Sequence, residues 1–374
     1  MRSVSLRRAW WAFPLALVSA VGGCGSVSKS RGHDEVSRLV KERTGRETRW
    51  AQGAPEESEI DRWVTARLAG GLTRDAAVDV ALVNNPHLQE TYEELGLSQA
   101  EVVQAGLLHN PSVGAHVAFP VRGDGKEISF SLVQDFLDAL VLPLRERIAS
   151  EQFTIDVLRV AQRALETVAD VEKEVATVQA ATALVAYRRT AVDAAEGAAA
   201  LSNAQLEAGD VSDFRHASQV VLGEQLAVEL ARDELELVRH HERLTQLLGL
   251  SGARADWKLA EALPTPPASD PGLDALEALA LRRRLDVDAA RKQRLLFGKA
   301  VALARDTRFI GRLDIGVDAH QDADGPRVLG PNLVIELPIF DQRQALIARL
   351  EARERGAARH VAALEGQARG DVRV

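Results

Sequence analysis

Apolar side chains recur along this chain with two different periods, and the first period predicts helices. Between residues 73 and 108 they recur every three or four positions, which is the spacing of one helix face. Asn85-Pro86 interrupts this pattern and Asn110-Pro111 ends it, because proline lacks the backbone N–H that a helix interior needs. We therefore expect a helix with one break in this region.

The second period predicts strands. Apolar residues alternate with polar or small ones in 113–119 and again in 128–132, and Gly123-Asp124-Gly125 lies between the two runs. Alternation with a period of two is the pattern of a strand that has one apolar face. This region is therefore predicted to form two strands joined by a turn-rich connection.

The same order of elements returns about 200 residues later, which indicates an internal duplication. Residues 273–307 have helical spacing, with Arg284-Leu285-Asp286-Val287 where the first copy has Asn85-Pro86-His87-Leu88. Alternating runs follow at 313–319 and 333–339. We expect four strands in two matched hairpins.

A long helical hairpin is expected between the two copies. Residues 144–206 contain no proline and carry apolar residues at spacings of three and seven, so about 60 helical residues would extend roughly 90 Å. Gly209 breaks this run, and a second helix is predicted over 212–248. The proline-rich residues 262–271 then separate the copies.

The N-terminus resembles a bacterial lipoprotein signal. Three arginines within residues 2–8 precede an apolar run at 9–21, which is too short to span a bilayer but has the size of a signal-peptide core. The run ends in Val21-Gly22-Gly23-Cys24, which resembles a lipobox, so residues 1–23 are predicted to be removed and Cys24 to carry lipid. Cys24 is the single cysteine, so no disulfide is expected. A plain signal peptide with an incidental cysteine is the alternative.

Composition narrows the class of protein. The chain of 374 residues has 46% apolar but only 4% aromatic residues, and the prevalence of Ala, Leu, Arg and Glu favours long helices. The formal charge of −8 comes from mixed charges of both signs, which argues against a nucleic-acid-binding face. No nucleophile elbow, phosphate loop or dinucleotide-binding glycine pattern occurs, so we expect no catalytic residue, no cofactor beyond the lipid and no enzyme activity.

The strands suggest an assembly, because their apolar faces need a cover of core or lipid. Four strands cannot close a barrel, whereas three chains with four strands each would close one of twelve, with polar faces toward the lumen. The chain is therefore predicted to be mainly helical with a small β part. Long antiparallel coiled-coil helices and four amphipathic strands would contribute to a trimeric 12-stranded outer-membrane β-barrel and a periplasmic α-helical tube.

Five local motifs, in order and in duplicate, resemble the TolC-like outer-membrane efflux family over residues 72–374. They are Asn85-Pro86-His87-Leu88, Leu107-Leu108-His109-Asn110-Pro111-Ser112, Glu207-Ala208-Gly209-Asp210-Val211-Ser212-Asp213, Leu247-Leu248-Gly249-Leu250 and Leu337-Pro338-Ile339-Phe340-Asp341. The resemblance implies a homotrimer in the cell outer membrane that docks on a periplasmic adaptor and an inner-membrane pump. It would be a passive export duct for small molecules or metal cations, and Phe136-Leu137-Asp138 resembles the cation-efflux branch.

The resemblance places one candidate site at the periplasmic tip of the hairpin. Gly209, Asp210, Ser212 and Asp213 match the turn on which adaptors dock, and Asp213 matches a residue that helps hold the tunnel closed. The alternative is a helix C-cap at Gly209 and an ordinary helix start at Asp213.

A second candidate site follows from strand alternation. Asp314, Asp318, His320 and Glu336 would face the lumen, where a ring of charge could favour cations. A solvated face without ion preference is the alternative.

No metal site is expected. His116 and His320 lack a Cys, His or carboxylate at the close spacing of a structural or catalytic metal site. His240-His241-Glu242 resembles a fragment of a zinc-protease motif, but no second His follows at the required place. These three residues are predicted to lie on a solvated helix face.

The predicted organisation has five segments. They are a signal peptide (1–23), an extension after the lipidated cysteine (24–72), a first efflux repeat (73–250), a proline-rich linker (251–272) and a second repeat (273–374). Laid over the first copy, the second stops near the position of Asp170, so about 75 residues of a second hairpin have no counterpart. A truncated, non-functional remnant of the family is therefore one alternative. The other is a periplasmic adaptor protein, which would have one central hairpin flanked by β-rich halves.

Overall fold

The structure of the chain is a computed structural model with two compact units. It describes residues 32–119, 121, 126–265, 272–322 and 325–373, so the predicted leader and Cys24 lie outside the described residues. Among the described residues, the strands and the helix ends beside them form one unit (within 99–150 and 307–342), and the other unit is helical (within 32–98, 151–306 and 343–373). No helix within the described residues combines the length and the apolar character needed to cross a membrane.

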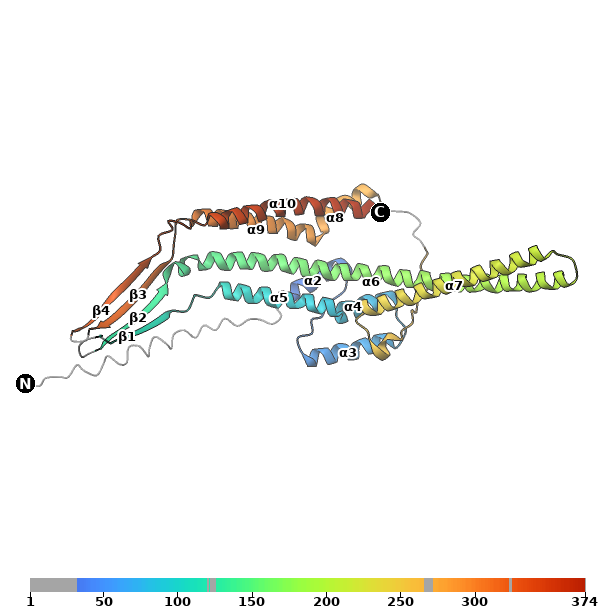
Figure 1. Cartoon of the computed structure of the whole chain (residues 1–374), viewed down its shortest axis with the longest axis horizontal. Coiled ribbons are helices and arrows are strands. Elements are labelled where there is room, and N and C mark those ends of the chain that lie inside the picture. Colours follow the sequence, from blue (N-terminus) through green and yellow to red (C-terminus); the bar gives the residue numbers. More distant parts are fainter. Residues whose placement is uncertain (1–31, 120, 122–125, 266–271, 323–324, 374) are drawn as a thin grey trace, which may run out of the picture. The chain divides into compact units, whose positions relative to one another are not determined.

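The strand unit contains one antiparallel sheet. Its strands are β1 (Ser112–Ala118), β2 (Glu127–Asp135), β3 (Leu313–Gln321) and β4 (Arg327–Ile335), in the order β1-β2-β3-β4 (Figure 1). The two predicted hairpins are confirmed, and pairing of β2 with β3 joins them. In this pairing Leu132 stands opposite Val317, so residues from the two repeats become neighbours.

The fourth strand differs from its predicted position. We expected it over 333–339, but β4 ends at Ile335, and Leu337 and Ile339 lie beyond it. The ladder stops there because Ile335 is paired with Leu313, the first residue of β3. Pro331 falls inside β4, a position that proline tolerates because β4 is an edge strand of the chain's sheet.

The predicted helix breaks recur in both repeats. The first repeat has α4 (Arg74–Asn84) and α5 (Pro86–Ala105), and the second has α8 (Leu273–Arg283) and α9 (Leu285–Asp306). The residues at the breaks have nearly the same extended backbone, with φ −65° and ψ 120° at Asn85 and φ −68° and ψ 124° at Arg284. The duplication is therefore confirmed in local conformation, although the two break residues differ in chemistry.

The long hairpin consists of α6 (Phe136–Glu207) and α7 (Asp213–Leu247), and α10 (Gln344–Arg373) follows the sheet (Figure 1). α6 has 72 residues and contains Pro143, so it is longer than the predicted 144–206. α7 matches its prediction to within one residue. Within the helical unit, α6 carries a buried stripe of small and β-branched residues: Val160, Ala161, Ala164, Val171 and Val175.

The core of the helical unit is centred on α4. Its residues Ala77, Val78, Val80, Ala81 and Leu82 are all fully buried, so most of the surface of this helix is packed in the interior. Thr73 caps its N-terminus, because the Thr73 hydroxyl accepts the Ala76 N–H at 3.0 Å.

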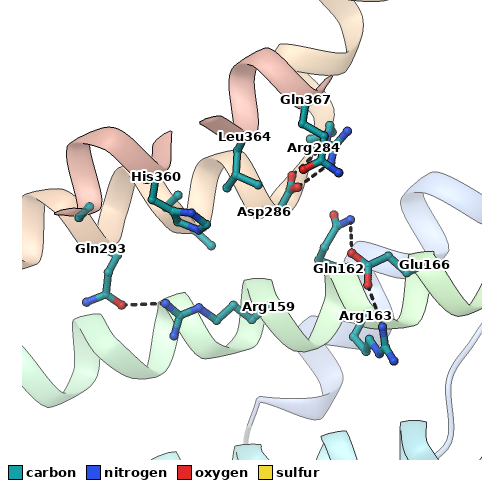
Figure 2. A pocket seen from close by; sticks show the side chains of 13 residues that line it. Arg159, Gln162, Arg163, Glu166, Arg284, Asp286, Gln293, His360, Leu364 and Gln367 are labelled. Atoms are coloured by element: carbon teal, nitrogen blue, oxygen red, sulfur yellow. Dashed lines mark hydrogen bonds and ion pairs between the residues drawn. The ribbon is translucent and has the colours of Figure 1, made fainter. Parts of the chain in front are cut away.

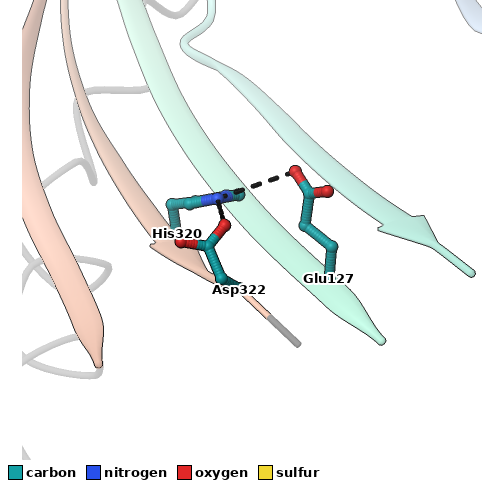
Figure 3. A group of neighbouring side chains, drawn as sticks. All are labelled: Glu127, His320 and Asp322. Atoms are coloured by element: carbon teal, nitrogen blue, oxygen red, sulfur yellow. Dashed lines mark hydrogen bonds and ion pairs between the residues drawn. The ribbon is translucent and has the colours of Figure 1, made fainter. Parts of the chain in front are cut away.

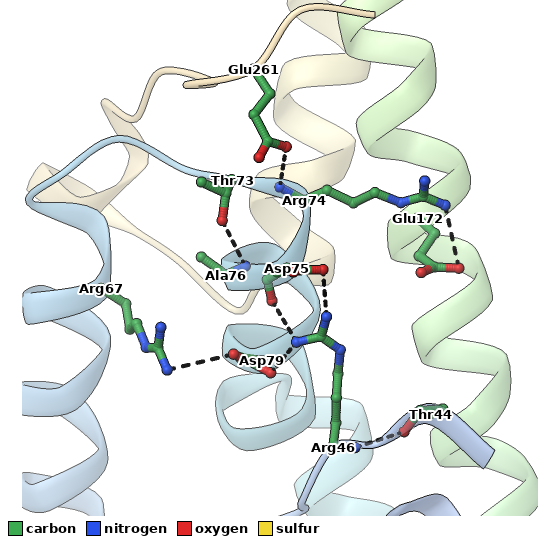
Figure 4. Close-up of polar contacts among 10 residues, drawn as sticks. All are labelled: Thr44, Arg46, Arg67, Thr73, Arg74, Asp75, Ala76, Asp79, Glu172 and Glu261. Atoms are coloured by element: carbon green, nitrogen blue, oxygen red, sulfur yellow. Dashed lines mark hydrogen bonds and ion pairs between the residues drawn. The ribbon is translucent and has the colours of Figure 1, made fainter. Parts of the chain in front are cut away.

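The segment predicted as an extension forms two helices, α2 (His33–Thr44) and α3 (Ala54–Leu68). Arg46, which follows α2, holds this segment to α4 through ion pairs of 2.5 Å with both Asp75 and Asp79 (Figure 4). Arg67 of α3 approaches the other oxygen of Asp79 at 3.6 Å. Two neighbouring segments therefore share one carboxylate of α4.

The first part of the predicted proline-rich linker is packed against the helical unit. A 3-10 helix, η1, spans Gly252–Ala255, and Leu259 forms a parallel β-bridge with Leu72. Trp257 is buried and donates its indole N–H to Thr245 at 2.9 Å. Residues 266–271 of the linker lie outside the described part of the chain.

Candidate functional site

One face of the sheet is apolar and exposed. Side chains alternate along each strand, so the ladder aligns Val113, Leu132, Val317 and Pro331 in one row across all four strands. Phe130 is 55% exposed and Leu329 66%. The apolar residues of this face, here called the apolar face, are Val113, Ala115, Val117, Ile128, Phe130, Leu132, Leu313, Ile315, Val317, Ala319, Leu329, Pro331, Leu333 and Ile335. Gln134, Gln321 and Arg327 lie on the same face in its outer rows. An exposed apolar surface of this extent marks a contact with lipid or with another protein.

The opposite face, here called the polar face, carries hydroxyl, charged and small side chains on its inner strands. One row across the sheet is Gly114, Ser131, Asp318 and Gly330, and the next is His116, Ser129, His320 and Val328. A Cβ on Gly114 would lie only 2.5 Å from Ser131 Oγ, so glycine makes room for that hydroxyl. The predicted separation of apolar and polar faces is present on β1 to β3, whereas β4 also carries Val328 and Val334 on the polar face.

Three of the four predicted lumen-facing residues lie on the polar face of β3. Asp314 is only 7% exposed and pairs with Arg312 at 2.8 Å. Asp318 is half-buried, and its Oδ1 has no hydrogen-bond partner among the described residues. Glu336 lies outside the ladder, because β4 ends at Ile335, and it accepts the Arg312 N–H at 3.0 Å. Glu336 thus lies one residue beyond β4, where its own N–H still donates to the Arg312 carbonyl at 2.9 Å, and its position in the lumen stays a prediction.

Two carboxylates lie next to His320 at the ends of β2 and β3 (Figure 3). His320 Nε2 is 2.6 Å from Asp322 Oδ1 and 3.6 Å from Glu127 Oε1. The sequence analysis missed this group because Glu127 belongs to the other repeat. The strand pattern could have indicated this group if β2 had been paired with β3, because Glu127 begins β2 two residues before Ser129, the partner of His320.

The tip of the helical hairpin is a compact turn. Gly209 has φ 79°, and the Gly209 and Asp210 N–H groups donate to the carbonyls of Leu206 (2.9 Å) and Gln205 (2.8 Å). This is a Schellman motif, which ends α6. Ser212 caps α7 by accepting the Arg215 N–H at 3.4 Å, and Asp213 is the first helical residue. The alternative of a C-cap and an ordinary helix start therefore describes the geometry, and adaptor docking and gating stay predictions.

Two asparagine side chains at the helix break of the first repeat bind the C-terminal end of α7. Asn84 Nδ2 donates to the carbonyls of Leu248 at 2.8 Å and Gly249 at 2.9 Å, and Asn85 Nδ2 donates to that of Leu247 at 2.7 Å. Two motifs far apart in the sequence thus meet in the helical unit. These bonds occupy carbonyls at the helix C-terminus that would otherwise lack intrahelical partners.

A buried aspartate joins α6 to the segment before β1. Asp138 accepts the His109 N–H at 3.0 Å and an Arg145 N–H at 2.7 Å, and Arg145 also donates to the carbonyls of Ala105 and Leu107. Burial alone would raise the pKa of Asp138, but the His109 N–H and the Arg145 guanidinium outweigh it and hold that pKa below its ordinary value. Asp138 belongs to the quoted Phe136-Leu137-Asp138 motif, which therefore has a structural role.

The prediction of a solvated face at His240-His241-Glu242 was wrong for both histidines. His240 Nδ1 lies 2.6 Å from an oxygen of Glu174, whose side chain is 7% exposed. His241 stacks on Trp257 with 3.9 Å between ring centroids and 7° between ring planes. The first helix of the hairpin, α6, and the packed linker thus cover this face.

A polar cavity of about 360 Å³ lies between α6, α9 and α10 (Figure 2). Its arginines are already bonded: Arg159 donates to Gln293 at 3.0 Å, and Arg284 pairs with Asp286 at 2.8 Å and Asp371 at 2.6 Å. Arg163, which also lines the cavity, pairs with Glu166 at 3.2 Å. The bond between Arg159 and Gln293 joins the second repeat to α6, and all three arginines already have a partner within the protein.

No family model and no curated protein sequence matches the chain, but solved structures share its fold. The CmeC outer membrane channel of Campylobacter jejuni has a TM-score of 0.64 and 13% identity, over 88% of this chain and 73% of the channel. The outer membrane protein VceC of Vibrio cholerae has 0.62 and 15%, over 79% and 75%. A membrane protein from Pseudomonas aeruginosa has 0.62 and 20%, over 80% and 74%. The chain therefore has the TolC-like fold of the outer-membrane channels, with long helices and a small antiparallel sheet.

Proposed function

We propose that this chain is one protomer of a trimeric outer-membrane efflux channel, a passive export duct for small molecules or metal cations. The observation that carries the proposal is the sheet, in which an exposed apolar face lies back to back with a polar one. Lipid covers the apolar face and water in the lumen contacts the polar face, which is the division that transmembrane strands show.

The free edges of the sheet support a trimer. β1 and β4 each pair on one side only within the described residues, and unpaired edges in a membrane leave backbone groups without hydrogen bonds. Pairing β4 of one chain with β1 of the next, three times over, closes a barrel of twelve strands, which is enough to enclose a lumen.

The other parts of the chain take roles that follow from this arrangement. Gly209, Asp210, Ser212 and Asp213 form an exposed turn at which a periplasmic adaptor docks, and an inner-membrane pump supplies the energy for export. Cys24 carries acyl chains that anchor the protein in the outer membrane, since more than one chain is needed for stable anchoring. No residue acts in catalysis.

The test is to express the full chain with its own leader and to isolate outer membranes. The expected product is a lipid-modified trimer that dissociates on heating, and Cys24→Ala should lose acyl labelling. The purified trimer should also conduct ions across a planar bilayer. Degraded or aggregated monomer in place of a membrane trimer would contradict the proposal.

A further inference from the structure

The group formed by Glu127, His320 and Asp322 has the composition and spacing of a cation site (Figure 3). One ligand atom of each residue lies within 4.8 Å of the other two. We propose that these three side chains bind a divalent transition-metal cation, of which Zn²⁺ is the best match to one imidazole nitrogen and two carboxylate oxygens.

The backbone ladder brings Glu127 close to His320, and Asp322 follows directly after the end of β3. Ser129 pairs with His320 and Ile128 with Gln321, so Glu127 and Asp322 occupy the next positions at the same end of the two strands. Because side chains alternate, Glu127, His320 and Asp322 all belong to the polar face. The approach of Glu127 and His320 is therefore set by the ladder before a cation arrives, which reduces the entropy lost on binding.

The electrostatics of the group favour a cation. Two carboxylates and one imidazole carry a formal charge of −2 when the imidazole is neutral. Arg327, a cation on the adjacent strand, donates to Gln321 at 2.9 Å, and Gln321 points to the opposite face from His320. A bound divalent ion would neutralise the pair of carboxylates.

Binding requires that Nε2 of His320 carry no proton. His320 Nε2 lies at hydrogen-bond distance from Asp322 Oδ1, and in the neutral ring the proton has to reside on Nδ1 for Nε2 to donate its lone pair to the metal. Small rotations of the three side chains then bring each ligand to the usual distance of about 2.0–2.2 Å. Three protein ligands leave a fourth position for water, whereas structural zinc sites have four protein ligands.

The test measures Zn²⁺ bound by the purified full chain in detergent, by equilibrium dialysis and after removal of any histidine tag. We expect a site that His320→Asn, Asp322→Asn and Glu127→Gln each weaken by at least about tenfold, since loss of even an outer-shell partner typically costs that much. The matched control is His116→Asn, because His116 lies on the same face in the same cross-strand row as His320. Far-UV circular dichroism confirms that each variant is folded.

The pattern of zinc binding among the variants decides whether the three residues form the site. Loss of the site in the three ligand variants and its retention in His116→Asn would support the proposal. Unchanged binding in His320→Asn, or an equal loss in His116→Asn, would overturn it. The assay requires neither a trimer nor transport, so its result is independent of the proposed channel function.

Discussion

The side chain of Asn85 donates to the carbonyl oxygen of Leu247 at 2.7 Å, across 162 residues of sequence. The same side chain accepts the Leu88 N–H at 3.0 Å through Oδ1, so it caps α5 while its amide binds the end of α7. Asn85 is 4% exposed, so this one buried side chain supplies a hydrogen-bond partner to the N-terminus of α5 and to the C-terminus of α7.

Asn85→Ala should lower the free energy of unfolding by about 2–3 kcal/mol, because it removes both a helix cap and a partner of a C-terminal carbonyl. Thermal unfolding followed by circular dichroism measures this. Thr73→Ala is the control, since Thr73 caps α4 with a single bond to Ala76 and should cost about 1 kcal/mol. Equal losses in the two variants would show that the bond to Leu247 contributes nothing.

Gly249 and Gly209 offer a matched pair of substitutions to alanine. Both end a helix with positive φ, at 64° and 79°. A Cβ on Gly249 would lie 2.3 Å from the carbonyl oxygen of Asn84, whereas a Cβ on Gly209 would meet no atom within 4 Å. Gly209→Ala should cost about 1–2 kcal/mol for the left-handed backbone alone, and Gly249→Ala clearly more. A similar fall in melting temperature for both would refute the close approach of Asn84.

The stability of the strand unit should depend on pH through Asp138. Its pKa in the folded state is lowered, so its contribution is complete above the unfolded value of about 3.9 and is lost as the pH falls through the lower folded value. Asp138→Asn should be less stable than wild type at pH 7. The difference between the two proteins should shrink below pH 4, as measured by urea unfolding. A constant difference from pH 7 to pH 2.5 would exclude this linkage.

Substitution by arginine should reduce membrane assembly when it is made on the apolar face of the sheet but not when it is made on the polar face. Val117 and His116 are neighbours in β1 and point to the apolar and the polar face. Val117→Arg adds a charge to the apolar face in the row that ends in Arg327. A charge facing lipid costs about 2–4 kcal/mol at the bilayer centre and about 0–1 kcal/mol near the interfaces, so the amount of trimer in outer membranes should fall. His116→Arg should leave that amount close to wild type. Normal assembly of Val117→Arg would argue against a lipid-facing surface.

Local sequence determined most of the elements of this protein. Asn85-Pro86, Gly209 and Gly249 end helices through backbone constraints that act within a few residues. These helix ends can therefore be predicted from the sequence without knowledge of the fold. Alternation in β1 to β3 likewise reveals which side chains share a face. Alternation alone placed the fourth strand too late, because its register depends on the strand opposite.

Only the tertiary structure decided which distant residues meet. Pairing of β2 with β3 joins the repeats in one sheet and brings Glu127 to His320, and packing covers His241 with Trp257 from a segment whose prolines suggested a linker. Periodicity shows that a face must be buried or paired, but it does not specify the partner. The partner depends on which surfaces fit and exclude water together, and that is a property of the whole folded chain.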